Sequence, residues 1–354
     1  MNKLLGLTRF FPEKAPGVKT LVICNYKWYR SYYWHIPQLD NNLADGTVTV
    51  VNFAELGVPG GTQISIFKKM SLLKGLITET DRVIVDGFPG YGVFLLIILG
   101  AFKTKRLILA TQNYIALSLS FRSISKFMFL KLAFGRADLI FCCSHGSRRL
   151  FWSYFGANVA RKCKVFYSPI NLESLPDFLP PSTTVGSYVL SAGQANRDYH
   201  LLSLALKDFH GPVTINCPRG VYEEIEFSHN VSYQKNLPTS ELLSLISNCR
   251  FLVIPLQDTI EPSGLRILYF GLELGKAIIV SETEPLKEIF SDTPPFIFYP
   301  CGCSSSLSEI IQDLNKDEEK IRLMGAHARE WAENNLLSSD HVNEIWRTEV
   351  LTLH

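Results

Sequence analysis

Short apolar runs rich in Val, Ile, Leu and Phe alternate along this chain with longer stretches of helical periodicity. In the first half, the runs predicted to form buried strands are residues 20–24, 48–53, 82–85, 106–110, 139–143 and 164–167. Predicted helices lie between several of them, at residues 62–76, 93–102, 117–134 and 146–155. Such alternation is typical of a doubly wound parallel sheet with helices on its faces.

The same alternation returns in the second half of the chain. Predicted strands occupy residues 188–191, 213–217, 251–255 and 277–281, and predicted helices occupy residues 199–209, 240–248, 264–274 and 285–290. From about residue 304 the sequence is expected to be helical. The break between the two halves, residues 171–187, contains three prolines and no periodicity, which is typical of a linker.

The sequence therefore predicts an α/β protein with two doubly wound, Rossmann-type domains. The 354 residues, of which 47% are hydrophobic, provide enough material for two cores. We expect a first domain over residues 1–170, a linker over 171–187 and a second domain over 188–300. Helices over 301–354 are expected to pack back toward the first domain. The two domains would face each other across a cleft, because ligands bind at the carboxyl ends of such sheets.

The net charge of +2 conceals a strong division between the two halves. Residues 1–170 contain 22 Lys and Arg against 8 Asp and Glu, a net charge of +14, so the remainder carries −12. Between Asp86 and Glu173 the only acidic residue is Asp138. This asymmetry indicates either an anionic partner of the first half, such as a membrane, a nucleic acid or a phosphorylated substrate, or attraction between the two halves.

Neither the cysteines nor the apolar segments indicate secretion or membrane insertion. The eight cysteines include no C-x-x-C pair and lack zinc-site spacing, so reduced thiols in a cytoplasmic protein are expected. No signal-peptide core is found at residues 1–12. The longest uncharged stretch, residues 87–102, is sixteen residues long, shorter than the roughly 20 needed to span a bilayer.

The segment around Glu261 carries the most chemical information. A predicted strand ends at Pro255, and a loop then leads to Ser263 and Gly264, which open a helix. Unpaired amides at a helix start, together with the helix dipole, favour a bound phosphate. Glu261 beside that anion would suit sugar hydroxyls, because a carboxylate accepts hydrogen bonds and repels a second anion. The alternative is that Glu261 and Ser263 only cap the helix.

Over roughly residues 185–295 the sequence resembles the donor-binding domain of the glycosyltransferase family 4 group, which has the two-domain GT-B fold. The residues that match the motifs of the group are Asn230, Val231, Tyr233, Pro238, Glu241, Leu242, Pro255, Glu261, Gly264, Gly275, Lys276 and Ala277. The stretch from Ser191 to Tyr199 also resembles the first donor-domain loop of the group. The resemblance implies a nucleotide-sugar donor, with Gly193 and Arg197 at its diphosphate.

Two departures from this pattern concern the chemistry rather than the fold. The group usually has a second Glu that holds the ribose, but the comparable position here is Tyr269 or Phe270, and Glu273 could substitute for it. The group also tends to have a His at the end of a strand in the first domain. Here the comparable segment offers Gln112 and Asn113, which become the candidate acceptor-side residues.

Cleavage of a sugar–nucleotide bond places negative charge on the departing diphosphate, which Arg197 and the helix start near Gly264 and Leu265 would stabilise. The chain contains no D-x-D motif, so neither a metal nor a cofactor is expected. A retaining transfer, the preferred expectation, needs no side-chain base. An inverting transfer would need one, and Asp86 is the candidate, although it could equally cap its own turn. Lys235 could meet the donor or simply be solvated.

The basic first half fits an acceptor at a membrane. Residues 121–136 mix aromatic side chains and Met with four cations, which is the composition of an interfacial helix, although an interior helix is the alternative. Residues 26–34 contain six aromatic side chains that could stack on sugar rings, pack in a core or anchor at an interface.

Together these features predict a hexosyltransferase-like glycosyltransferase that is either cytoplasmic or peripheral on the inner membrane face. Its acceptor would be a lipid-linked sugar or a polysaccharide, and no nucleic acid is expected as a partner. Two alternatives are a sugar-nucleotide epimerase of the same fold and an inactive partner subunit, the latter because the second Glu is missing.

Overall fold

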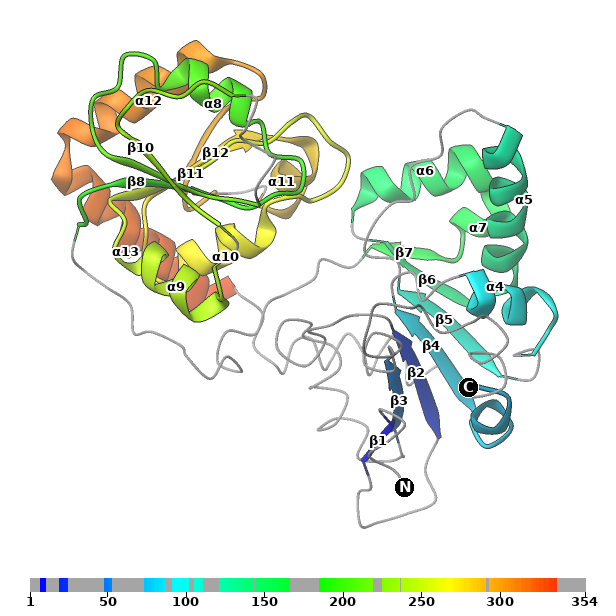
Figure 1. Ribbon diagram of the computed structural model, residues 1–354. Helices are drawn as coiled ribbons and strands as arrows, with labels where there is room; N and C mark the ends of the chain where they lie inside the picture. Colours follow the sequence, from blue (N-terminus) through cyan, green and yellow to red (C-terminus); the bar gives the residue numbers. More distant parts are fainter. Residues whose placement is uncertain are drawn as a thin grey trace. The chain divides into compact units, whose positions relative to one another are not determined.

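The computed structural model describes residues 7–10, 19–24, 48–52, 73–86, 91–101, 105–110, 121–142, 144–165, 185–218, 225–235, 237–290 and 293–335 (Figure 1). These residues form two compact units. The described part of the first unit ends at Val165, and that of the second unit begins at Val185. The predicted linker, residues 171–187, overlaps the segment between these two ends. The predicted cleft between the domains remains a prediction.

The first unit is built on one sheet of strand order β1-β3-β2-β4-β5-β6-β7. Its strands are β1 (Leu7–Phe10), β2 (Thr20–Cys24), β3 (Val48–Asn52), β4 (Arg82–Asp86), β5 (Arg106–Ala110), β6 (Leu139–Cys142) and β7 (Cys163–Val165). Only β1 runs antiparallel to its neighbour; the pairs from β3 to β7 are all parallel. Every residue of β2 and β6 is buried, as expected for central strands covered on both faces.

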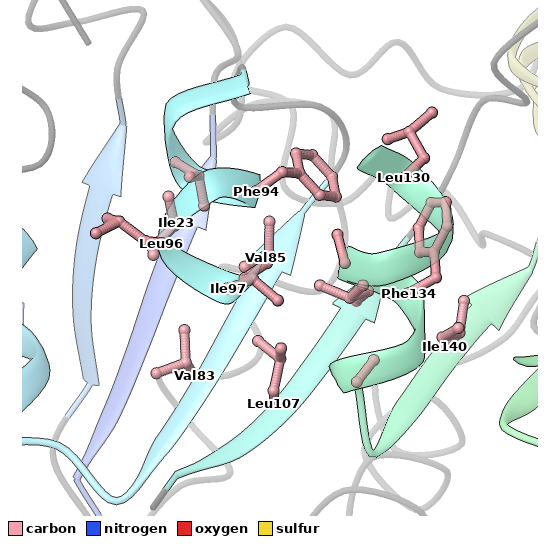
Figure 2. Packing of buried hydrophobic residues seen from close by; sticks show 14 of the residues in the cluster. Ile23, Val83, Val85, Phe94, Leu96, Ile97, Leu107, Leu130, Phe134 and Ile140 are labelled. Atoms are coloured by element: carbon pink, nitrogen blue, oxygen red, sulfur yellow. The ribbon is translucent and has the colours of Figure 1, made fainter. Parts of the chain in front are cut away.

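Four labelled helices accompany this sheet: α4 (Tyr91–Ile98), α5 (Phe121–Arg136), α6 (His145–Phe155) and α7 (Ala157–Ala160). Phe94 of α4 and Phe134 of α5, whose ring centroids are 6.1 Å apart, belong to the same buried cluster as Val83 and Val85 of β4, and Figure 2 labels all four residues. Ile84 lies between these two valines, points to the other face and is also fully buried. Both faces of the sheet are therefore covered, which confirms the doubly wound α/β prediction.

The second unit contains a six-stranded, all-parallel sheet of order β10-β9-β8-β11-β12-β13. Its strands are β8 (Val189–Ala192), β9 (Val213–Asn216), β10 (Val231–Gln234), β11 (Phe251–Ile254), β12 (Ile278–Glu282) and β13 (Ile297–Pro300). Its helices are α8 (Tyr199–Ala205), α9 (Thr239–Ser247), α10 (Leu265–Glu273), α11 (Glu284–Ile289), α12 (Ser304–Lys316) and α13 (Glu318–Asn335). The strand order reverses between β8 and β11, which is where doubly wound sheets bind their ligands.

The C-terminal helices belong to the second unit. Helices α12 and α13 pack on it, and α13 approaches the end of α10 so closely that a Cβ on Gly325 would collide with the carbonyl of Gly275. The sequence predicted that helices over residues 301–354 return toward the first domain, but the described helices of this range belong to the second unit. Residues 336–354 lie outside the described residues, as do residues 26–34. Within the described part of the chain, no helix is both long and apolar enough to cross a membrane.

Candidate functional site

Two loops leave the carboxyl ends of β8 and β11, the two strands at which the sheet order reverses. The first loop spans residues 193–198 and the second spans residues 255–264. Arg197 of the first loop forms a short antiparallel bridge with Leu256 of the second. The two segments that the sequence identified as donor-binding are therefore held together at the ligand-binding edge of the sheet.

Asn196 ties the same loops together through both its backbone and its side chain. Its carbonyl accepts from the amide of Gln257 (2.9 Å), and its Nδ2 donates to Oγ of Ser263 (2.7 Å). Its φ of 52° lies in the left-handed region, which Asn tolerates better than most residues. The sequence analysis did not identify Asn196, although an Asn in a short loop after a strand is a recognisable turn signal.

Arg197 is buried, with 8% of its surface exposed, and lies over Gly193. Its Nε donates to the carbonyl of Ala192 (3.0 Å) and its Nη1 to the carbonyl of Ala195 (2.9 Å). Gly193 has a φ of 113°, and a Cβ there would collide with the guanidinium. The glycine is therefore required twice, by its backbone conformation and by the space that Arg197 fills.

No carboxylate of the described residues pairs with Arg197, and its guanidinium donates to two backbone carbonyls. The pKa of the guanidinium is lowered to about 10, chiefly by burial; Tyr199 opposes this decrease, and the positive charge of Arg266 contributes to it. At neutral pH Arg197 remains a cation. A buried cation of this kind favours an anion that enters from outside, because the new ion pair would offset its desolvation.

The start of α10 provides a second feature that favours an anion. Gly264 is the N-cap, with a φ of 85° and no side-chain cap, and the first turn of the helix contains no acidic residue. The N-cap position of α10 is therefore occupied by Gly264 rather than by Glu261 or Ser263. Arg266, which the sequence analysis missed, extends from this first turn, and its guanidinium lies 5.7 Å from the ring centre of Phe270.

Glu261 lies in the loop just before this helix start and is half-buried. Its amide donates to Oγ1 of Thr259 (3.1 Å), and its carbonyl accepts from the amide of Ser263 (2.7 Å). The backbone of Glu261 is thus held on both sides. These two hydrogen bonds fix the backbone position from which the side chain of Glu261 extends.

The remaining predicted residues are spread more widely. Leu265 is the first residue of α10, and Lys235 is exposed directly after the edge strand β10. Asp86 is the last residue of β4, at the carboxyl edge of the first sheet, but its side chain is not among the described ones. Gln112 and Asn113 lie outside the described residues. The roles assigned to these residues remain predictions.

Glu273 has a partner that the sequence did not predict. It lies at the opposite end of α10 from Gly264, and Nη1 of Arg329 on α13 donates to both its Oε2 and its carbonyl (2.6 Å each). Tyr269 and Phe270, which occupy the position of the usual second Glu, are 4% and 0% exposed. Neither aromatic side chain is therefore open to a ribose, and a ribose-binding role of Glu273 remains a prediction.

Metal ligands and disulfides do not contribute to the described part of the site. No group of three or more His, Cys, Asp or Glu residues suited to a metal ion occurs among the described residues. The seven cysteines in the described ranges are all free thiols, and five of them are buried. The expectation that no metal is needed remains a prediction.

Comparison with known proteins identifies the fold. Neither a protein-family model nor a curated protein sequence matches the chain. Solved structures do match: sucrose-phosphate synthase from Thermosynechococcus elongatus has a TM-score of 0.70 at 12% identity, covering 95% of this chain and 100% of that one. Anabaena HepE in complex with UDP has a TM-score of 0.67 at 14% identity, with the same coverage. A glycosyltransferase from Rickettsia africae has a TM-score of 0.63 at 13% identity, covering 96% of this chain and 100% of that one.

These structural neighbours are glycosyltransferases of the GT-B type, and the chain shares their fold. The GT-B expectation drawn from the sequence is thereby confirmed. At 12–14% identity the likeness establishes the fold alone.

Proposed function

We propose that this GT-B chain is a glycosyltransferase that moves a sugar from a nucleotide-sugar donor to an acceptor. The observation that carries the proposal is the buried, carboxylate-free guanidinium of Arg197, bridged to the loop that opens α10 at the reversal point of the second sheet. HepE, a structural neighbour, was solved with UDP and with UDP-glucose, which supports a nucleotide-sugar donor.

In this proposal the donor diphosphate lies between Arg197 and the first turn of α10. When the bond to the sugar breaks, negative charge grows on the diphosphate, and the guanidinium and the helix amides stabilise it. Both are fixed before the reaction by the backbone links between the loops, so little reorganisation is needed during the reaction. Glu261 would accept hydrogen bonds from sugar hydroxyls and orient the reacting ring.

The finer features rest on the sequence. We propose a metal-independent, hexosyltransferase-like transfer with retention, because the chain has no D-x-D motif and the leaving phosphate can take the acceptor proton. Asp86 would act as the base only if the transfer inverted. A lipid-linked sugar or a polysaccharide at the cytoplasmic face of a membrane is the proposed acceptor, because the first half carries a charge of +14.

One observation favours a second candidate, an inactive partner subunit that binds the donor without turnover. The position of the usual second Glu is occupied by buried aromatic side chains, and Glu273 is engaged by Arg329. The two candidates differ in turnover on an acceptor rather than in donor binding.

The test is a thermal-shift panel of UDP, GDP and CMP and their sugars, followed by turnover assays with Glu261→Ala. A ligand at 100 times its dissociation constant adds about 2.7 kcal/mol to the stability of the native state, so binding is measurable. Glu261→Ala should keep nucleotide binding and lose most of the turnover, because its contacts orient the sugar.

Glu241→Ala is the matched control, because Glu241 is an exposed glutamate on α9 of the same unit. Full activity of Glu261→Ala would remove the assigned role of this residue. Absence of binding by every nucleotide would overturn the proposal. Conversion of the nucleotide sugar without an acceptor would assign an epimerase instead.

A further inference from the structure

The helical layer formed by α5 and α6 exposes large apolar side chains to solvent. Met128 and Leu132, one turn apart on α5, are 50% and 55% exposed, and Trp152 on α6 is 65% exposed. Tyr154 on α6 is 37% exposed. The exposed sides of α5 and α6 that carry Met128, Leu132 and Trp152 are called here the outer helical face.

The two helices are neighbours on the same side of the first sheet. The ring of Phe127 on α5 stacks on Phe155 of α6, with centroids 5.5 Å apart, and Phe134 meets Phe151 edge-on at 5.0 Å. Leu130 and Ala133 turn the same side of α5 toward the core. Because these contacts occupy the inner sides of both helices, the outer helical face points away from the core.

The same two helices carry several cations and no acidic residue. Residues 121–165 contain nine Lys and Arg and one acidic residue, Asp138. Oδ2 of Asp138 accepts from the amide of Leu107 (2.7 Å), which belongs to β5. Lys131, Arg136, Arg148 and Arg149 are exposed on α5 and α6. The outer helical face therefore combines exposed hydrophobic groups with exposed positive charge, on two helices that contain no acidic residue.

We propose that the outer helical face docks on an anionic lipid bilayer. Interfacial helices insert Trp and Leu at the headgroup boundary while Lys and Arg meet acidic headgroups, and this face presents both kinds of group. A nucleic acid would use the cations but would gain little from the aliphatic side chains of Met128 and Leu132. The inference specifies the surface for the membrane location proposed above, and its test does not depend on sugar transfer.

The first experiment is co-sedimentation of the full-length protein with vesicles of phosphatidylcholine, with or without phosphatidylglycerol. Binding should require phosphatidylglycerol and should weaken steeply as salt rises, because headgroup attraction is screened. Absence of binding, or equal binding to both vesicle types, would overturn the proposal. A competition experiment adds single-stranded RNA to the bound protein. The proposal would also be overturned if RNA displaced the protein from the vesicles and if the variants described below all lost vesicle binding equally, because the cations alone would then account for binding.

Two triple variants test the apolar and the basic parts of the face separately. Changing Lys131, Arg136 and Arg148 to Gln should weaken vesicle binding roughly 100-fold, since each cation near an acidic surface contributes a factor of about five. Changing Met128, Leu132 and Trp152 to Ser should weaken it roughly tenfold or more and leave the salt dependence intact.

Matched controls come from exposed residues of the second unit. Leu204 and Leu323 are 53% and 63% exposed, and Lys207, Lys316 and Lys320 are exposed cations. Changing the leucines to Ser, or the lysines to Gln, should leave vesicle binding within about twofold of that of the unchanged protein, because these residues do not belong to the outer helical face. Equal losses in the face variants and in these controls would overturn the assignment of the surface.

Tryptophan fluorescence can test whether the bilayer contacts Trp152 itself. Brominated lipids should quench part of the tryptophan emission, and Trp152→Phe should remove that part, whereas Trp331→Phe on α13 should not. Quenching that survives Trp152→Phe unchanged would contradict the proposal. Every variant is also tested for the thermal shift with UDP: loss of vesicle binding with an intact UDP response separates failure of this face from failure of the donor site.

Discussion

At the scale of single residues, Arg197 shows how a loop can hold a charge ready for a ligand. Its two carbonyl acceptors and its position over Gly193 fix the guanidinium inside the protein, within the segment that the sequence predicted as the first donor-domain loop. The cost of burying this charge is offset only partly by neutral carbonyls. The same residue is therefore expected to influence both stability and donor binding.

Arg197→Ala should abolish most of the thermal shift caused by UDP, because it removes the charge-assisted contact with the diphosphate. It should also lower stability by about 1–3 kcal/mol, since two buried carbonyls lose their donors. Arg197→Lys should recover part of the UDP response, because it retains the charge. The measurements are melting temperature with and without UDP, and exposed Arg322 on α13, changed to Ala, serves as the control. An unchanged UDP response in Arg197→Ala would contradict the assignment.

A comparison of two glycines can separate the effect of backbone conformation on stability from its effect on the candidate site. Gly264 and Gly302 both have a positive φ, 85° and 79°, but only Gly264 opens α10 at the candidate site. A Cβ on Gly264 would lie 3.2 Å from Cγ2 of Ile254, whereas a Cβ on Gly302 would meet nothing within 4 Å.

Changing either glycine to Ala should cost about 1–2 kcal/mol for the left-handed backbone. Only Gly264→Ala should in addition weaken UDP binding, because the start of α10 would shift. Chemical denaturation and nucleotide titration measure the two effects. Equal UDP affinity in both variants would show that the start of α10 does not hold the diphosphate.

At the scale of secondary-structure elements, the contact between α10 and α13 decides the environment of Glu273. Gly325 allows the helices to approach closely, and Arg329 of α13 then reaches both the carboxylate and the carbonyl of Glu273. The side chains of this pair are 27% and 19% exposed, so the pair lies between a surface salt bridge and a buried one.

Glu273→Gln and Arg329→Gln should each destabilise the protein by about 1–2 kcal/mol, and the double variant should lose less than the sum, because the two residues interact. If Glu273 serves only this helix contact, both single variants should bind UDP equally well. Selective loss of UDP affinity in Glu273→Gln would instead support a ribose-binding role. A double-mutant cycle of unfolding free energies, run with and without UDP, distinguishes these outcomes.

At the scale of the whole molecule, each unit has its own sheet and its own buried cluster of hydrophobic residues. The candidate donor residues on β8, β11 and α10 all belong to the second unit. Donor binding should therefore stabilise that unit directly, whereas the outer helical face belongs to the first. The proposed membrane docking and the proposed nucleotide binding therefore concern separate units.

Calorimetry should consequently show an unfolding profile with more than one transition, because proteins of two domains often depart from two-state behaviour. UDP should raise the transition of the second unit, by an amount that increases with ligand concentration. Arg197→Ala should abolish the shift of this transition specifically. A single transition that UDP shifts as a whole would contradict independent unfolding of the units.

The sequence by itself determined the α/β class, the central strands and the positions of the two loops that are proposed to bind the donor. Strands β2 and β5 coincide with the predicted ranges, because a strand buried on both faces must be apolar throughout. The edge strands β1, β10 and β13 were not predicted. The residues of β10 alternate between half-buried and exposed, so this edge strand lacks the continuous apolar run that identified the central ones.

Only the tertiary structure decided which loops meet and what surrounds each charge. Sequence periodicity indicates which residues of one helix or strand are buried. It does not indicate contacts between distant segments, such as the hydrogen bond from Asn196 to Ser263, which spans 67 positions and depends on the strand order. The same holds for Arg329 and Glu273, which are 56 positions apart. Burial of Arg197 and exposure of Met128, Leu132 and Trp152 were equally outside the reach of composition, because only packing determines which side of a helix or loop is covered.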